Sequence, residues 1–327
     1  MTLVLSYACQ DFTVQVSDRR LTSLKGEVLE EMANKAVLIK PFMSFSYTGL
    51  SRMGVNRGEP TDELLMEALA ERLFMGVEAA VHNLAAIATK QCRETALRGL
   101  SAEQKAEARR TSFVGAGFTR IRHGAPYRPT LCVVSNAQDL DEAWRPQADR
   151  DFAVHVAFMP APSAGHLHVA GQPLRKAERI QLERLLRRAR IKSAGPESVA
   201  RLLSRAVREV SLRNSAVGPN AMCLILRRPV IGDTAELLAG GMMPLYPEFQ
   251  DEMSFFRRPI DGERPGPDFI YSPGSPDDLE YFGPNVFSAG VLLRGLKGNV
   301  DQRSQTARPE VSITVEARTV APPTDRW

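Results

Sequence analysis

The chain begins Met1-Thr2-Leu3-Val4-Leu5-Ser6-Tyr7, a strand-like run with a hydroxyl-bearing residue at its second position. Cytosolic aminopeptidases remove an initiator methionine when the next residue is small. We therefore expect Met1 to be removed and no leader segment to precede the first strand. Thr2 would then carry a hydroxyl and a free α-amine on neighbouring atoms. That pair is a nucleophile with its own base.

Two strand pairs follow, and their ends carry polar residues. In 12–18, Phe12, Val14 and Val16 alternate with polar residues, the period-two pattern of a strand. Residues 36–40 and 43–48 predict two more strands, joined by a turn at Pro41-Phe42. The sequence thus begins with two β-hairpins.

Counting residues across each hairpin suggests which side chains meet. If the first turn centres on Gln10, Thr2 lies opposite Asp18, and if it centres one half-residue later, Thr2 lies opposite Arg19. In the second hairpin the count places Lys35 opposite Thr48. If the hairpins lie side by side in one sheet, Thr2, Asp18, Lys35 and Gly49 come together at their open ends.

These four residues suit acyl transfer. The Thr2 hydroxyl would attack a carbonyl, and its α-amine, with an ordinary pKa of about 7.7–8.0, would accept the proton. A nearby Lys35 cation would lower the pKa of that amine, and Asp18 would hold Lys35 in place. The backbone N–H of Gly49 would stabilise the oxyanion, a contact worth about 3–4 kcal/mol in comparable sites.

The order of elements predicts the fold class. The predicted helices cover 61–98 (interrupted at Gly76), 101–110, 174–191 and 197–213, and the later strands cover 111–119, 130–136, 152–159, 165–170 and 221–226. Strands and helices do not alternate, which argues against a doubly wound parallel sheet. We predict an α+β fold in which two antiparallel sheets are each covered by a helix pair, a four-layer αββα sandwich.

The amino-acid composition of the chain changes at about residue 229. Residues 1–228 carry the predicted domain, whereas 229–327 are dense in proline and glycine and form a C-terminal extension that wraps the core or mediates contacts. Within it, Val286 to Leu293 predicts one strand. The polar tail after about residue 298 is expected to be disordered.

Composition narrows the class of protein. The formal net charge of +4 over 327 residues does not by itself imply a nucleic-acid partner. The four cysteines form no CxxC pair and lie in apolar runs, which predicts buried free thiols in a reducing compartment. No apolar run approaches the roughly 20 residues of a membrane helix. We expect a cytoplasmic protein that binds neither membrane nor nucleic acid and needs no cofactor or metal.

At these residues the chain resembles a known family. Thr2 before a strand, Ser17-Asp18-Arg19-Arg20, Asn34-Lys35 and Tyr47-Thr48-Gly49 are similar to the proteasome β-subunit and its bacterial relatives, which are N-terminal-nucleophile hydrolases. The resemblance covers about residues 2–228. It implies the αββα sandwich, endopeptidase activity through an acyl-enzyme, a homo-oligomeric ring and an ATPase unfoldase as a possible partner. It also implies that Arg20 and Thr48 contact the peptide substrate.

Three positions depart from the family pattern. The family often supports its nucleophile with an Asp and a Ser after the fourth helix, where this chain has Asn214 and Val217, with Ser215 between them. A further supporting Ser usually precedes the third helix, where this chain has Gln172. Three function classes therefore stay open: a threonine peptidase, an amide hydrolase for small substrates, and a catalytically silent scaffold.

A histidine pair and a basic segment also suggest functions, but each has a simpler structural interpretation. His166 and His168 share one face of a predicted strand and could ligate a metal, although ordinary packing explains them better without a third ligand. Residues 174–213 carry twelve Lys or Arg against four Glu, a net charge of +8. This segment could bind nucleic acid, but the absence of interleaved aromatic residues favours a solvated or subunit-contact surface.

Overall fold

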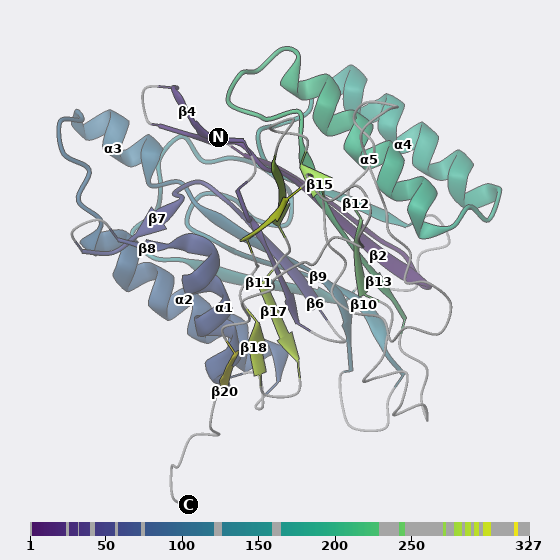
Figure 1. Cartoon of the computed structure of the whole chain (residues 1–327), viewed down its shortest axis with the longest axis horizontal. Helices are drawn as coiled ribbons and strands as arrows, with labels where there is room; N and C mark the ends of the chain where they lie inside the picture. The colour runs from purple at the N-terminus through teal and green to yellow at the C-terminus, as the bar shows by residue number, and fades with distance from the viewer. Residues whose placement is uncertain are drawn as a thin grey trace, which may run out of the picture.

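The computed structural model describes residues 2–228, except for gaps at 24–25, 32, 40–42, 56–57, 73–75, 121–125 and 159–164, and beyond residue 228 only the strands given below. Within these residues the chain is a mixed α+β protein with five helices and several sheets that are antiparallel except for one strand pair (Figure 1). The predicted α+β class is therefore confirmed.

The first sheet contains the start of the chain. Its strands, in spatial order, are β12 (His166–Gly171), β1 (Leu3–Ala8), β2 (Phe12–Asp18), β13 (Ala221–Arg227) and β14 (Met242–Leu245). Helices α4 (Lys176–Ile191) and α5 (Pro196–Ser211) lie on one face of this sheet (Figure 1). The apolar residues of that face, such as Leu5 and Val14, form one cluster with Leu182 of α4 and Leu203 of α5. Pro196 begins α5 at the first helical position, where proline is favoured.

The second sheet is larger. Its order is β11 (Ala153–Phe158), β10 (Arg128–Ser135), β9 (Ser112–Thr119), β6 (Met43–Thr48), β5 (Ala36–Ile39), β17 (Asn285–Ser288), β18 (Val291–Leu293) and β20 (Ala317–Thr319). Helices α1 (Thr61–Arg72) and α2 (Val77–Glu94) pack against it through a separate cluster that includes Phe45, Leu69 and Leu84. A short helix, α3 (Ala102–Ala108), begins with a capping box between Ser101 and Gln104.

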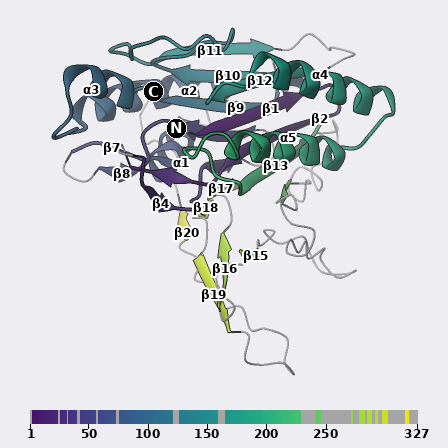
Figure 2. The same ribbon diagram turned by 90° about the horizontal axis from the view of Figure 1, so that it is seen from above.

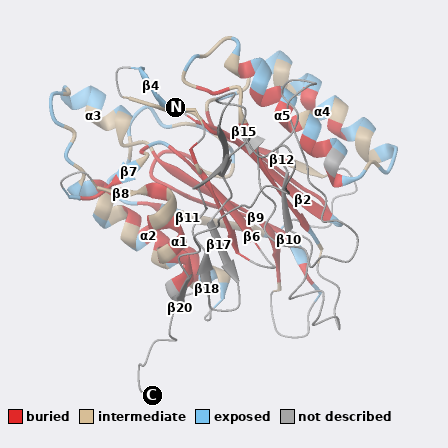
Figure 3. Cartoon of the chain, viewed as in Figure 1, coloured by how far each residue is buried: buried red, intermediate tan, exposed pale blue. Residues whose placement is uncertain are grey.

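The two large sheets face each other. Ala36 and Leu38 of β5 share an apolar cluster with Leu224 of β13, and Val4 of β1 shares another with Val114 of β9. Figure 2 shows the sheets from a second direction, with α4 and α5 on the outer side of β1 and β2. Most residues of the central strands are buried, while the outward sides of the helices are exposed (Figure 3).

A polar bridge links the sheets at their centre. The Gln15 side chain on β2 donates from Nε2 to Ser6 Oγ (3.1 Å) and to the carbonyl of Val114 on β9 (3.0 Å). Its Oε1 accepts from Ser46 Oγ on β6 at 3.0 Å. Each polar atom is thereby satisfied in the interior, which avoids the cost of burying an unpaired group. The bridge fixes how the two leading hairpins lie relative to each other.

Three smaller sheets complete the described strands. They pair β3 (Leu21–Thr22) with β4 (Val28–Glu30), β7 (Arg52–Met53) with β8 (Glu59–Pro60), and β16 (Asp278–Phe282) with both β15 (Tyr271–Ser272) and β19 (Lys297–Asp301). The sequence did not predict any of them. Each of the first two pairs is too short to show a period-two pattern.

Two sequence predictions about element limits are wrong. Helix α2 ends at Glu94 rather than near Arg98, because Thr95 adopts an extended conformation and its hydroxyl bonds to the Gln91 carbonyl. Residues 286–293 form two antiparallel strands, β17 and β18, rather than one. Both residues of the predicted Pro41-Phe42 turn lie outside the described residues, as does most of the tail after residue 298.

The extension does meet the core in two places. Strand β14 pairs with β13, and β17 pairs in parallel with β5. The four cysteines are free and buried, as predicted, and burial raises the pKa of the Cys132 thiol to about 12. Among the described helices, none has the length and apolar character needed to cross a membrane.

Candidate functional site

The Thr2 hydroxyl meets a buried ion pair. The Lys35 ammonium donates to Thr2 Oγ1 at 2.9 Å and to Asp18 Oδ2 at 3.1 Å. The side chains of Lys35 and Asp18 are both fully buried. Three of the residues named from the sequence therefore form one connected hydrogen-bonded group.

Asp18 organises this group through the backbone around it. Its carboxylate accepts from the N–H groups of Leu3 (2.7 Å), Arg20 (3.1 Å) and Gly218 (3.3 Å), in addition to Lys35. These donors belong to the start of β1, the end of β2 and the loop before β13. One carboxylate thus joins three chain segments to the Lys35–Thr2 group, and charge-assisted bonds of this kind are among the stronger ones in proteins.

The hairpins do not meet in the way that the counting argument supposed. They lie in different sheets, β1 and β2 in the first and β5 and β6 in the second, rather than side by side in one sheet. In the first hairpin Val4 pairs with Ser17, so the register leads Thr2 to Arg19, the second of the two predicted partners. In the second, Ala36 pairs with Ser46, which puts Lys35 opposite Tyr47 and not Thr48. The open ends still converge because the two sheets face each other.

The environment of Lys35 bears on proton transfer. Burial lowers the Lys35 pKa below its ordinary value, although the Asp18 carboxylate acts in the opposite direction. Its nitrogen has two fixed acceptors, Asp18 Oδ2 and the Arg20 carbonyl oxygen. Only the position facing Thr2 Oγ1 changes role with protonation: an ammonium donates there, whereas a neutral amine can accept the hydroxyl proton. Lys35 can therefore either hold the hydroxyl or deprotonate it.

The backbone of Thr2 is held by Gly171, Gln172 and Thr48. The sequence did not single out Gly171, and it predicted other roles for Gln172 and Thr48. The Thr2 carbonyl accepts from the Gln172 N–H (2.9 Å) and from Thr48 Oγ1 (3.3 Å). Gly171 has a φ of +81°, and a Cβ at this position would lie 1.9 Å from the Thr2 carbonyl oxygen. Glycine is therefore required for β12 to approach Thr2 so closely. No sequence pattern singled out Gly171, because a lone glycine at a strand end has many explanations.

Gly49 has the backbone conformation that a turn demands. Its φ is +109°, and a Cβ would lie 2.3 Å from the Arg110 carbonyl oxygen. It is exposed, unlike its buried neighbour Thr48. An exposed glycine beside the buried Thr2 group leaves its backbone accessible to a bound molecule. Its role as an oxyanion donor stays a prediction.

Arg20 holds a neighbouring loop. Its guanidinium bonds to the Glu31 carboxylate, with Nη2 and Oε1 separated by 2.7 Å, and Nη1 donates to the Ser215 carbonyl at 2.7 Å. These bonds favour a structural role for the side chain. Contacts of Arg20 and Thr48 with substrate stay predictions.

The loop after α5 reaches the site through its backbone. Asn214 Oδ1 accepts from the Ala216 N–H at 3.0 Å, Val217 is buried in the α4–α5 cluster, and the Ser215 residue is exposed. Among the described hydrogen bonds, this loop reaches Asp18 through the Gly218 N–H. Asn214 and Val217 thus stabilise the loop itself.

His166 and His168 do not form a metal site in the described structure. His168 is fully buried, neither of its ring nitrogens has a hydrogen-bond partner among the described residues, and Nδ1 lies 3.6 Å from Glu142 Oε1. Burial lowers the pKa of His168 to about 4. No group of three His, Cys, Asp or Glu side chains in the part of the chain that the structure describes could hold a metal ion.

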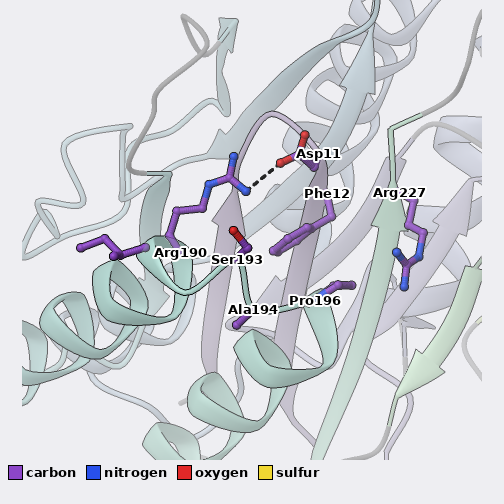
Figure 4. Close-up of a pocket in the computed structure, with 9 residues that line it drawn as sticks. Asp11, Phe12, Arg190, Ser193, Ala194, Pro196 and Arg227 are labelled. Atoms are coloured by element: carbon purple, nitrogen blue, oxygen red, sulfur yellow. Dashed lines mark hydrogen bonds and ion pairs between the residues drawn. The ribbon is translucent and has the colours of Figure 1, made fainter.

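A separate cavity lies at the other end of the first hairpin. It has a volume of about 560 Å³ and is lined by Asp11, Phe12, Arg227 and the α4–α5 turn. Figure 4 shows the Arg190 side chain directed at Asp11, with which it forms an ion pair of 2.7 Å. Because β1 runs from Thr2 toward this turn, the cavity is roughly 20 Å from Thr2 at about 3.3 Å per residue. It is not part of the Thr2 site.

No protein-family model matches the chain, and no curated protein matches it.

Proposed function

We propose that this chain is an N-terminal-nucleophile amide hydrolase with the αββα sandwich fold, and that Thr2 is its nucleophile after removal of Met1. The observation that carries the proposal is the 2.9 Å contact between Lys35 Nζ and Thr2 Oγ1, with Asp18 paired to the same nitrogen in a fully buried setting. A buried ion pair is costly to keep and is weak evidence for stability alone. Its placement against a hydroxyl next to the chain start favours a chemical role.

The proposed mechanism assigns a step to each of these groups. Thr2 Oγ1 attacks the carbonyl carbon of an amide, and its proton passes to the Thr2 α-amine or to a neutral Lys35. The tetrahedral intermediate carries its negative charge beside the Gly49 N–H. The C–N bond then breaks, the departing amine takes up the proton, and an ester forms on Thr2. Water attacks the ester, releases the acid and restores the hydroxyl.

The resemblance to proteasome β-subunits favours a peptide substrate, a homo-oligomeric ring and an ATPase unfoldase as partner. A small-molecule amidase on the same fold is the closest alternative. The substitutions at Asn214 and Val217 favour a third possibility, a silent scaffold, since they remove two side chains that usually support the nucleophile.

A covalent probe tests the proposal. The purified protein is treated with a peptide epoxyketone or vinyl sulfone and its intact mass is measured. We expect loss of Met1 and one adduct on Thr2, no adduct in Thr2→Ala, and a normal adduct in Thr13→Ala, which alters another buried threonine. A protein that retains Met1, or reacts equally as Thr2→Ala, would exclude the assignment. Hydrolysis of casein compared with short acyl-amides then separates peptidase from amidase.

A further inference from the structure

The outer face of α4 and α5 is strongly basic. Nine of the twelve cations in residues 174–213 are exposed, against the exposed acids Glu183 and Glu209. The exposed cations are Arg175, Lys176, Arg184, Arg187, Arg188, Lys192, Arg201, Arg205 and Arg208. We call these cations and the groove between the two helices the α4–α5 face.

The other three cations have a different role. Arg179 pairs with Glu142, Arg190 pairs with Asp11 at 2.7 Å, and Arg213 pairs with Glu178 at 2.7 Å. Arg179 and Arg190 tie α4 to the body of the protein, and Arg213 ties the end of α5 to the start of α4. Arg179 also pairs with Glu183 of α4 at 2.8 Å, so two of the acids on α4 are already matched by these arginines. Among the residues whose burial the structure describes, the exposed cations of the α4–α5 face outnumber the exposed acids of the same segment by nine to two.

An apolar groove runs between the helices. It encloses about 70 Å³ and its apolar lining consists of Leu174, Leu182, Leu185, Leu202 and Ala206. That volume is a few times the ~30 Å³ that a water molecule occupies, so it accepts an anchoring side chain rather than a whole ligand.

Cations border the groove on both sides. The polar residues of its lining are Glu178, which is paired with Arg213, and Gln181, Arg205 and Glu209. Arg184 and Arg188 follow Gln181 at helical spacings, and Arg201 precedes Arg205 by one turn, so these three lie on the same helix faces as the lining residues.

We infer that the α4–α5 face is a docking surface for an acidic amphipathic helix of a partner protein. A helix that lies in a groove places apolar side chains at i, i+3, i+4 and i+7 into it, and its flanking acids would meet the bordering arginines. The inference goes beyond the proposed function and does not depend on Thr2.

Two other occupants fit less well. A second copy placed face to face would bring like charges together, which opposes association. Nucleic acid would pair with the cations but would leave the apolar lining of the groove without a partner. Residues 174–213 also contain no Phe, Tyr or Trp for base stacking.

Fluorescence anisotropy tests the inference with a synthetic helical peptide of about 18 residues that carries leucines at groove spacing and glutamates elsewhere. We expect saturable binding to the full chain. Arg184→Glu with Arg205→Glu should weaken it by about tenfold or more, since each reversal replaces attraction with repulsion. The matched control is Lys90→Glu with Arg98→Glu, which changes the net charge by the same amount. Lys90 lies on α2 and Arg98 just after it, both are exposed, and the change in affinity should be less than about twofold.

Further arms separate the alternatives. A peptide with serines in place of the leucines should bind about tenfold more weakly if the groove is used. The inference is overturned if wild type does not bind the peptide, if both variant pairs weaken binding equally, or if the serine peptide binds as well. It is also overturned if a DNA duplex of about 20 base pairs binds more tightly with the same dependence on Arg184 and Arg205, or if these reversals dissociate a dimer of the chain. Circular dichroism checks the folding of each variant, and Arg188→Glu with Arg201→Glu provides a second test pair.

Discussion

Replacing Lys35 by methionine should cost the protein both stability and reactivity. Lys35 and Asp18 are fully buried and 3.1 Å apart, and the variant removes the cation while leaving the carboxylate in place. Breaking a buried pair from one side typically costs about 3–5 kcal/mol. Three backbone N–H groups still donate to Asp18, so we expect a loss near the lower end, about 3 kcal/mol, in the free energy of unfolding.

Reactivity should fall by a separate amount. Lys35 is the side chain that contacts Thr2 Oγ1 at 2.9 Å, whether it holds the hydroxyl or takes its proton. General acid–base groups contribute about 10²–10⁴-fold, which corresponds to about 3–5 kcal/mol at 1.36 kcal/mol per tenfold change. Urea denaturation measures the first loss, and the rate of adduct formation on Thr2, followed by mass spectrometry without urea, measures the second.

The outcomes of this experiment are distinct. Lys90→Met, which alters an exposed cation on α2, should change stability by less than about 0.5 kcal/mol and leave the rate unchanged. A folded Lys35→Met protein that reacts within a few-fold of wild type would refute the catalytic role of Lys35. In that case a loss of stability alone would reduce the Lys35–Asp18 pair to a structural contact.

Three further predictions concern single positions. Burial lowers the His168 pKa from 6.5 to about 4, so as the pH falls the unfolded chain binds the proton before the folded chain does. The free energy of unfolding should be unaffected above about pH 6.5 and should fall by about 3 kcal/mol between pH 6.5 and pH 4. Urea titrations should find this loss in wild type and not in His168→Leu. Gly171→Ala puts a Cβ 1.9 Å from the Thr2 carbonyl, and displacing the nucleophile by about 1 Å should slow adduct formation by about a hundredfold; an unchanged rate would remove the need for glycine there. Gly49→Ala keeps the backbone N–H but puts a Cβ 2.3 Å from the Arg110 carbonyl oxygen, which must move that N–H; if the N–H stabilises the oxyanion, turnover should slow toward the roughly 10²–10³-fold loss that follows removal of one such donor, and steady-state kinetics that match wild type would exclude that role.

The order of elements could be predicted because it depends on periodicity, which each segment carries in its own residues. Pairing details depend on turns. The predicted register of the second hairpin differs from the structure by one residue, because the count across residues 40–42 depends on the geometry of the turn. A shift of one residue moves every side chain of a strand to the opposite face of the sheet. The alternation in β2 correctly predicted a strand, but Thr13, Gln15 and Ser17 are buried because a second sheet covers the face that they occupy. One strand cannot show what covers it.

The candidate site divides in the same way. Thr2, Asp18 and Lys35 could be named because their side chains carry recognisable chemistry at strand ends. The groups that fix them are backbone atoms: the N–H groups of Leu3, Gly218 and Gln172. Every residue except proline has such a donor, so residue type does not indicate where one is used.

This distinction bears on Asn214 and Val217. In the family that the chain resembles, a carboxylate and a hydroxyl at these positions usually support the nucleophile. Here the loop is instead held by the Asn214 turn, the burial of Val217 and the bond from Arg20 to the Ser215 carbonyl. Gly218 then delivers its N–H to Asp18, and a Cβ there would lie 2.6 Å from Arg20 Cβ, so the approach needs glycine. The loop therefore supports the Lys35–Asp18 ion pair, and in the proposed mechanism proton transfer from Thr2 would fall to Lys35 and the α-amine.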